Sequence, residues 1–237
     1  MRFRFVMSGD DVWRLPPTRA EVAFLGRSNV GKSSLLNALA NHKRLAHTSK
    51  TPGRTQLLNL FELGDGTSAV DLPGYGFAAV PGKTRSGWQA MIEGYLLERA
   101  ELDMVLVLVD GEIGPTKLDV QMLDWLRAHG LPHTVVASKQ DKVKPSKRGV
   151  RRREVAEGCG VAVDDVVWVS AAKGDGIVEL RSLIHTWLAR GMASRPPVAP
   201  DGGGPAPLTP SAGKAAKGVV VVEPGPDGTY ADEDEWN

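Results

Sequence analysis

Short apolar runs alternate along most of the chain with longer segments whose apolar residues recur every three or four positions. This alternation is typical of strands joined by crossover helices, a connection that places the strands parallel in one sheet. The apolar runs cover residues 21–25, 57–61, 68–71, 104–109, 134–137 and 165–169. We therefore expect an α/β fold with a mostly parallel sheet that is covered by helices on both faces.

The segments with helical periodicity lie between these runs. They cover residues 34–40, 84–99, 117–129, 146–158 and 176–190. Gly130 and Pro132 follow the third of them and end it. The tryptophans of the later segments are too scattered to form a stacking platform, so we expect them to pack in the core. They are Trp125, Trp168 and Trp187.

The composition changes near residue 192. Residues 192–237 are rich in Pro and Gly and end close to the acidic run 232–235, a composition that buries too little apolar surface to order itself. We expect an N-terminal strand or extension at 1–19, one domain at 20–191 and a disordered tail at 192–237. Residues 218–223, Gly-Val-Val-Val-Val-Glu, have strand character. Disorder is the favoured interpretation of them, and pairing with an available sheet edge is the alternative.

Residues 26–33 match the pattern G-x-x-x-x-G-K-[ST] between the first strand and the first helix. In this context the backbone N–H groups of the loop surround the phosphates of a nucleotide, and the helix N-terminus adds partial positive charge. Lys32 would contact the β- and γ-phosphates and assist catalysis, and the Ser33 hydroxyl would bind Mg²⁺. The candidate phosphate-binding residues are Gly26, Arg27, Ser28, Asn29, Val30, Gly31, Lys32 and Ser33.

Two loops further along the chain have the pattern of a guanine site. Ser138-Lys139-Gln140-Asp141 follows one strand and fits [NTS]-K-x-D, in which the carboxylate accepts both N–H groups of guanine. Adenine would leave that carboxylate poorly paired, which costs about 1–3 kcal/mol or more. Val169-Ser170-Ala171 follows the next strand and would present backbone amides to the guanine oxygen. The order of the two loops favours guanine over adenine.

Two segments between these motifs are candidates for sensing the γ-phosphate. Asp71-Leu72-Pro73-Gly74 fits D-x-x-G at the end of a strand, so Asp71 would hold Mg²⁺ through a water and Gly74 would contact the γ-phosphate. The upstream candidates include Thr55, the favoured second Mg²⁺ ligand and a catalytic candidate, with Thr51 as the alternative ligand. These upstream nucleotide-contacting candidates are Gly53, Arg54, Thr55, Gln56 and Leu57. Such loops order on GTP and loosen after hydrolysis.

Three segments resemble one family. Residues 26–37 (Gly-Arg-Ser-Asn-Val-Gly-Lys-Ser-Ser-Leu-Leu-Asn), 51–56 (Thr-Pro-Gly-Arg-Thr-Gln) and 71–76 (Asp-Leu-Pro-Gly-Tyr-Gly) are similar to the EngB/YihA (YsxC) group of TrmE-Era-EngA-EngB-Septin-like bacterial GTPases. The resemblance extends over residues 3–190. It implies a P-loop NTPase with a Ras-like G domain, acting as a monomeric, Mg²⁺-dependent GTPase in large ribosomal subunit assembly. It also implies a need for the protein in normal cell division and septation.

Two positions depart from the pattern of that family. Glu112 stands where members carry Arg in Asp-x-Arg, and Ser138 stands where Thr is commoner. Neither position belongs to the phosphate loop, so the implied nucleotide binding is unaffected.

Tyr75 occupies the place where Ras-like enzymes have a Gln that orients the attacking water. We therefore expect slow intrinsic hydrolysis, with the water positioned by backbone, by another residue or by a partner. In related GTPases an Asn at the position of Asn29 helps to hold K⁺ beside the phosphates, so Asn29 is a candidate K⁺ ligand. Its alternative role is to cap the local turn. A K⁺ ion there predicts faster turnover in K⁺ than in Na⁺.

The net charge of +1 conceals a basic body. Residues 201–237 contain seven acidic residues and two lysines, a net charge of −5, which leaves +6 for residues 1–200. One basic cluster consists of Lys139, Lys142, Lys144, Lys147, Arg148, Arg151, Arg152 and Arg153, and a second of His42, Lys43, Arg44, Lys50 and Arg54. Such clusters bind RNA phosphates. A solvated helix face is the alternative, but the position of both clusters beside the nucleotide motifs favours RNA.

Other features point to the cytoplasm. No apolar run approaches the roughly 18 residues of a membrane span, and residues 1–20 lack the apolar core of a signal peptide. The single cysteine, Cys159, excludes an internal disulfide and fits a reducing compartment. The remaining functional alternative is a GTPase with a metabolic or tRNA-modification role. The chain has neither an Arg-rich lid nor room for a flavin or tetrahydrofolate domain, which favours the ribosomal switch.

Overall fold

The computed structural model describes residues 1–42, 45, 57–75, 82–195 and 220–221, and only the backbone of 82–88 and 220–221. In this part of the chain an eight-stranded sheet has the order β7-β6-β5-β2-β4-β3-β1-β8. The parallel strands are β2 (Ala20–Gly26), β4 (Thr67–Asp71), β5 (Leu102–Asp110), β6 (His133–Ser138) and β7 (Val166–Trp168). The antiparallel additions are β1 (Arg4–Gly9), β3 (Leu58–Gly64) and β8 (Val220–Val221). The predicted α/β fold with a mostly parallel sheet is confirmed.

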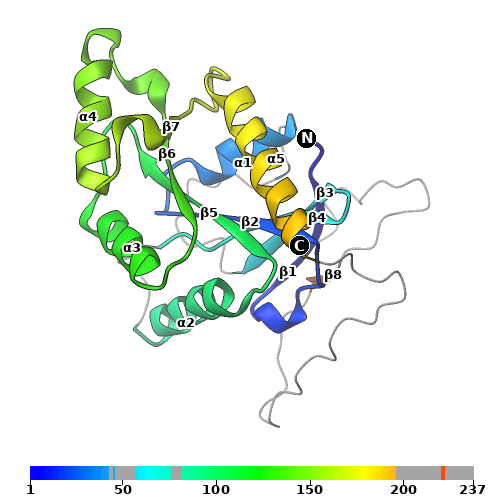
Figure 1. Ribbon diagram of the computed structural model, residues 1–237. Helices are drawn as coiled ribbons and strands as arrows, with labels where there is room; N and C mark the ends of the chain where they lie inside the picture. Colours follow the sequence, from blue (N-terminus) through cyan, green and yellow to red (C-terminus); the bar gives the residue numbers. More distant parts are fainter. Residues whose placement is uncertain (43–44, 46–56, 76–81, 196–219, 222–237) are drawn as a thin grey trace, which may run out of the picture.

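Helices cover both faces of the sheet (Figure 1). The helices α1 (Lys32–Ala40) and α5 (Ile177–Ser194) pack on one face, and α2 (Gly82–Glu98), α3 (Lys117–Ala128) and α4 (Arg148–Cys159) pack on the other. Side chains alternate along each strand, so β2 sends Val22 and Phe24 to the first face and Ala23 and Leu25 to the second. Short 3-10 helices occur at Val12–Arg14, Gln140–Lys142, Pro145–Lys147 and Val163–Asp165. Within the described residues, no helix combines the length and apolar character needed to cross a membrane.

The last helix extends beyond the expected domain end. The α5 helix continues to Ser194, and Arg195 then pairs with Asp103 at 2.9 Å and donates to the Arg19 carbonyl at 3.2 Å. These contacts fasten the end of α5 to the sheet, because Asp103 belongs to β5 and Arg19 precedes β2. The domain therefore keeps regular structure several residues past 191.

The residues Val220 and Val221 form β8, which pairs antiparallel with Ser8 and Met7 of β1. For these two residues the structure shows the alternative that the sequence left open, in which a sheet edge accepts the valine run. The other residues after 195 lie outside the described part of the chain.

The tryptophans differ in depth. Trp168 at the end of β7 is buried, as predicted. Trp125 and Trp187 are half-buried and pack against the margins of the two core clusters. The expectation of full core packing holds for Trp168 and overstates the burial of the other two.

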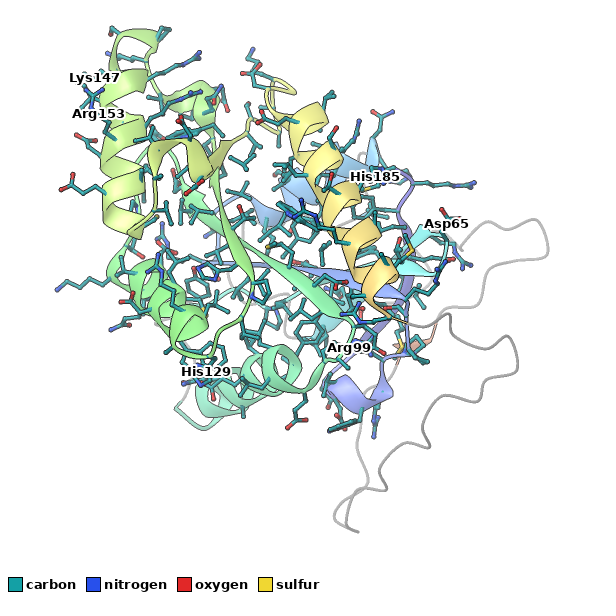
Figure 2. All side chains as sticks on the ribbon, viewed as in Figure 1. Asp65, Arg99, His129, Lys147, Arg153 and His185 are labelled. Carbon is teal, nitrogen blue, oxygen red and sulfur yellow. The ribbon has the colours of Figure 1, made fainter. Side chains whose placement is uncertain are left out.

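A buried ion pair lies at the amino end of β2. Glu21 is fully buried and accepts hydrogen bonds from Arg99 Nε at 2.8 Å, Tyr95 Oη at 2.7 Å and Ser68 Oγ at 2.6 Å. Arg99 also donates to the Pro16 carbonyl at 2.8 Å, and Figure 2 shows Arg99 beyond the end of α2. The pKa of Tyr95 lies well above its ordinary value because of burial and the neighbouring Glu21 carboxylate. This network fixes the carboxyl end of α2 to the sheet.

Candidate functional site

The candidate phosphate loop leaves the carboxyl end of β2 and opens into α1, the position at which open α/β sheets bind ligands. A side chain at Gly26 would come within 3.0 Å of Leu108 and Val30, so close packing requires glycine there. Gly31 has φ +104° at the N-cap of α1, where no side chain caps the helix. Asn29 is exposed with φ +64°. The first backbone N–H groups of α1 are thus left for an anion.

The loop is connected to the end of β4 through Lys32. The ammonium group donates to Asp71 Oδ1 and, at 2.5 Å, to the Leu72 carbonyl. The side chains of Lys32 and Asp71 are 8% and 3% exposed, so this is a buried ion pair. Ser33 follows on α1 and is half-buried. The predicted lysine, serine and aspartate therefore lie together at one edge of the sheet.

The D-x-x-G segment follows β4 and pairs with the phosphate loop along its backbone. The Tyr75 N–H donates to the Gly26 carbonyl at 3.2 Å, and the Ser28 N–H donates to the Tyr75 carbonyl at 3.1 Å. Gly74 packs so closely that a Cβ there would lie 2.9 Å from Ser28 Oγ. Pro73 and Leu72 are buried beside it. The segment is held against the loop by a short parallel bridge.

The first base loop follows β6 and also contacts the phosphate loop. The Ser138 hydroxyl donates to the Val30 carbonyl at 2.6 Å, so the serine bridges the two loops. Lys139, with φ +56°, donates from its ammonium group to Asp110 Oδ2 at 2.7 Å and to the Asn29 carbonyl at 3.0 Å. These contacts place the candidate guanine loop next to the phosphate loop.

The second base loop follows β7 and orients the candidate guanine-binding carboxylate. The Ser170 hydroxyl donates to Asp141 Oδ1 at 2.6 Å, and the Gln140 N–H donates to the Val169 carbonyl at 3.1 Å. Ala171 follows Ser170 and is half-buried. Asp141 keeps oxygen lone pairs for two further donors, which is the number that guanine offers.

Part of the predicted site lies outside the described residues. Thr51, Gly53, Arg54, Thr55 and Gln56 belong to this part, and Leu57 is the first described residue before β3. The predicted Mg²⁺ and catalytic roles of Thr55 stay predictions.

Sequence reasoning missed two acidic residues of the site. Asp110 at the end of β5 binds Lys139 and also accepts the Glu112 N–H at 2.9 Å. Its position at a strand end was the available signal. Asp119 on α3 accepts a hydrogen bond from the Tyr75 hydroxyl at 2.8 Å. Burial raises the pKa of Tyr75 above its ordinary value, and the neighbouring Asp119 carboxylate raises it further. No spacing rule connects Tyr75 with Asp119, which are 44 positions apart.

A glycine-bearing phosphate loop between β2 and α1, with two base loops at the same sheet edge, defines a P-loop GTPase. The comparisons with known proteins agree. A family model described as "50S ribosome-binding GTPase" matches residues 21–139. The probable GTP-binding protein EngB of Geobacter metallireducens is 45% identical over 188 residues, which cover 79% of this chain and 92% of that protein. Its counterpart in Pelotomaculum thermopropionicum is 47% identical over 169 residues, 71% of this chain and 85% of that one. This chain belongs to the EngB family of GTP-binding proteins.

Solved structures show the same relationship. A crystal structure of a probable GTP-binding protein EngB matches with a TM-score of 0.60 at 28% identity, covering 72% of this chain and 100% of the other. Era in complex with MgGDPNP and nucleotides 1506–1542 of 16S ribosomal RNA matches with a TM-score of 0.56 at 27% identity, covering 71% of this chain and 56% of that one.

Proposed function

We propose that this GTPase is a Mg²⁺-dependent nucleotide switch in the assembly of the large ribosomal subunit, located in the cytoplasm as a monomer, and needed for normal division and septation. The observation that carries the proposal is a nucleotide site and an exposed basic helix in one small domain. The description of the matching family supports the large subunit, and the 16S ribosomal RNA bound to Era supports contact with ribosomal RNA in general.

The geometry of the site supports a set of proposed nucleotide contacts. The phosphate loop binds the phosphates, Asp141 accepts the guanine N–H groups, and backbone at Val169–Ala171 contacts the guanine oxygen. Binding moves Lys32 from Asp71 to the phosphates. The freed carboxylate and the Ser33 hydroxyl suit Mg²⁺, a cation that prefers oxygen ligands and keeps several waters. When bound, Mg²⁺ neutralises charge on the β- and γ-phosphates.

The proposed K⁺ site uses Asn29. The residue is exposed at the tip of the loop, and Lys139 fixes its backbone carbonyl. A K⁺ ion beside it would supply positive charge to the phosphates. Steady-state hydrolysis measured in equal concentrations of KCl and NaCl tests this role. We expect faster turnover in KCl, and equal rates would refute the ion site.

The proposed RNA surface lies on and before α4. Lys142, Lys144, Lys147 and Arg153 are exposed, and none of them has an ion-pair partner in the described part of the chain. Figure 2 shows Lys147 and Arg153 at the outer side of α4. We call these four residues the basic α4 surface. Their charges are free to neutralise phosphates, which gives affinity that is only weakly dependent on sequence and falls with salt.

The other basic residues of this region are partly engaged. Arg151 pairs with Glu154 at 3.1 Å, and the Arg152 guanidinium lies 5.8 Å from the centre of the Trp168 ring. The sequence cluster therefore divides into an exposed set and a set with partners within the domain. The exposed set is the better target for mutation because its loss disturbs fewer internal contacts.

Co-sedimentation with purified large ribosomal subunits tests the proposal. The wild type is compared in GDP and in a non-hydrolysable GTP analogue, and we expect stronger association with the analogue. The triple variant Lys144→Ala, Lys147→Ala, Arg153→Ala should lose association and show a shallower dependence on salt while binding GTP normally. Arg14, Lys117 and Arg190 are exposed on other elements, so their triple alanine variant is a control of equal charge.

The outcomes separate the alternatives. Equal association of the two triple variants would remove the basic α4 surface from the proposal. Absence of association in both nucleotide states would refute the ribosomal role and favour a GTPase with a metabolic or tRNA-modification role.

A further inference from the structure

The side chain of Tyr75 points away from the phosphate loop and into the core. Its ring packs against the cluster formed by the sheet with α2, α3 and α4, and its hydroxyl donates to Asp119 Oδ1 on α3 at 2.8 Å. A side chain in this position cannot orient water at the γ-phosphate. The residue that replaces the usual glutamine must therefore act in a different way.

The Asp119 carboxylate that accepts this hydrogen bond is buried and is held by further hydrogen bonds. Asp119 is 1% exposed, and its second oxygen accepts the Thr116 N–H and the Thr116 hydroxyl, each at 2.7 Å. The bond from the Thr116 N–H is one half of the capping box at the start of α3, and the other half runs from the Asp119 N–H to the Thr116 side chain. A buried carboxylate without hydrogen-bond partners is unfavourable. Asp119 therefore keeps its hydrogen bonds to Thr116 and to Tyr75, and these bonds hold Tyr75 against α3.

The D-x-x-G segment is consequently fixed at both ends. At one end Asp71 belongs to β4, and the Leu72 N–H donates to the Phe24 carbonyl at 3.0 Å. At the other end Tyr75 is held by α3 through its side chain and by Gly26 through its backbone N–H. Only Pro73 and Gly74 lie between these attachments.

We propose that Tyr75 is a positioning residue whose bond to Asp119 places the Gly74 N–H for contact with the γ-phosphate. The bond between Tyr75 and Asp119 supports only the contact of Gly74 with the γ-phosphate, which GDP lacks. Loss of the tyrosine hydroxyl should therefore weaken GTP more than GDP. The inference rests on the proposed role of Gly74 in contacting the γ-phosphate, and it does not depend on the ribosomal role.

Affinities of fluorescent GDP and of a fluorescent non-hydrolysable GTP analogue test the proposal. We expect Tyr75→Phe to weaken the binding of the analogue about five- to tenfold and the binding of GDP less than twofold. A tenfold change in affinity corresponds to about 1.4 kcal/mol. Thr116→Val is the matched control, since it removes one hydroxyl donor to the other oxygen of the same carboxylate. It should leave the ratio of the two affinities unchanged even where it lowers the stability of the domain.

Equal effects of Tyr75→Phe on both nucleotides, or no effect on either, would overturn the proposal. Gly74→Ala distinguishes a failure of the positioning role of Tyr75 from a failure of its premise, which is the contact of Gly74 with the γ-phosphate. If Gly74→Ala changes the ratio and Tyr75→Phe does not, only the positioning role fails. If Gly74→Ala leaves the ratio unchanged, the role of Gly74 fails and the inference fails with it.

Hydrogen exchange of the wild type gives a second test that needs no variant. The Tyr75 amide, bonded to Gly26, should stay protected in the analogue-bound protein. Loss of that protection in the analogue-bound protein would show that the attachment is released and would overturn the proposal.

Discussion

Replacement of Asp71 by alanine should destabilise the protein and tighten its binding of GDP in the absence of Mg²⁺. Lys32 and Asp71 form a buried ion pair, and a phosphate that binds Lys32 competes with that carboxylate. Asp71→Ala leaves a buried ammonium group that retains the Leu72 carbonyl and lacks its anion. A nucleotide phosphate then supplies the missing negative charge.

The structure sets the size of the effect. Removal of one partner of a buried ion pair costs about 3–5 kcal/mol. Because Lys32 keeps its bond to the Leu72 carbonyl, we take about 3 kcal/mol. For a domain of this size each kcal/mol lowers the melting temperature by about 2–4 °C, which gives a fall of about 6–12 °C. If GDP recovers half of the lost energy, its affinity rises about tenfold.

The assay combines thermal unfolding of protein prepared without nucleotide with GDP titrations in EDTA. Asp110→Ala is the control, because Asp110 also pairs with a lysine, Lys139 at 2.7 Å, which belongs to the first base loop and not to the phosphate loop. The control should lose stability and gain no affinity for GDP. A melting temperature of Asp71→Ala within about 2 °C of the wild type, or an unchanged GDP affinity in EDTA, would refute the reasoning.

Three further predictions concern the base, the core and the pH dependence of stability. Asp141→Asn should weaken the binding of GTP about tenfold or more in competition titrations. It should strengthen the binding of xanthosine triphosphate, because the amide of Asn can donate a hydrogen bond to the oxygen that replaces the exocyclic amine of guanine. Arg99→Met leaves Glu21 buried without its cation and should lower the free energy of unfolding by about 3–5 kcal/mol, measured in urea. The folded variant should bind GDP normally, since this pair lies at the amino end of β2 and the nucleotide site lies at the carboxyl end. Burial raises the pKa of the Cys159 thiol from 9.0 to about 11, so the unfolded chain releases this proton first. Stability should then fall by about 2 kcal/mol as the pH rises from 9 to 11, and Cys159→Ala should lose this part of the pH dependence. If the variant keeps it, other groups are responsible.

The sequence predicted the parts of the site whose chemistry depends on local spacing. The phosphate loop, the D-x-x-G segment and both base loops are each continuous in the chain, and each follows a strand with a recognisable apolar pattern. The parallel sheet then places them at one edge, because the carboxyl ends of its strands lie together. Strand and helix predictions were confirmed for the same reason, with ends that differ by a few residues.

The contacts that organise the site could not be predicted in this way. The bonds from Ser138 to Val30 and from Tyr75 to Asp119 join residues 108 and 44 positions apart. They depend on how closely the elements pack, which no periodicity encodes. The division of the basic cluster was partly available, since Arg151 and Glu154 are three positions apart on a helix. The position of Arg152 over Trp168 required the fold.

The buried Glu21–Arg99 pair has a mechanical consequence for α2. The 17-residue helix begins at Gly82 and is fixed at its far end by Tyr95 and Arg99. A helix of this length spans about 25 Å, and the ion pair attaches one end of it to the sheet. At that length, a tilt of about 10° about the ion pair would displace the first residues of α2 by about 4 Å.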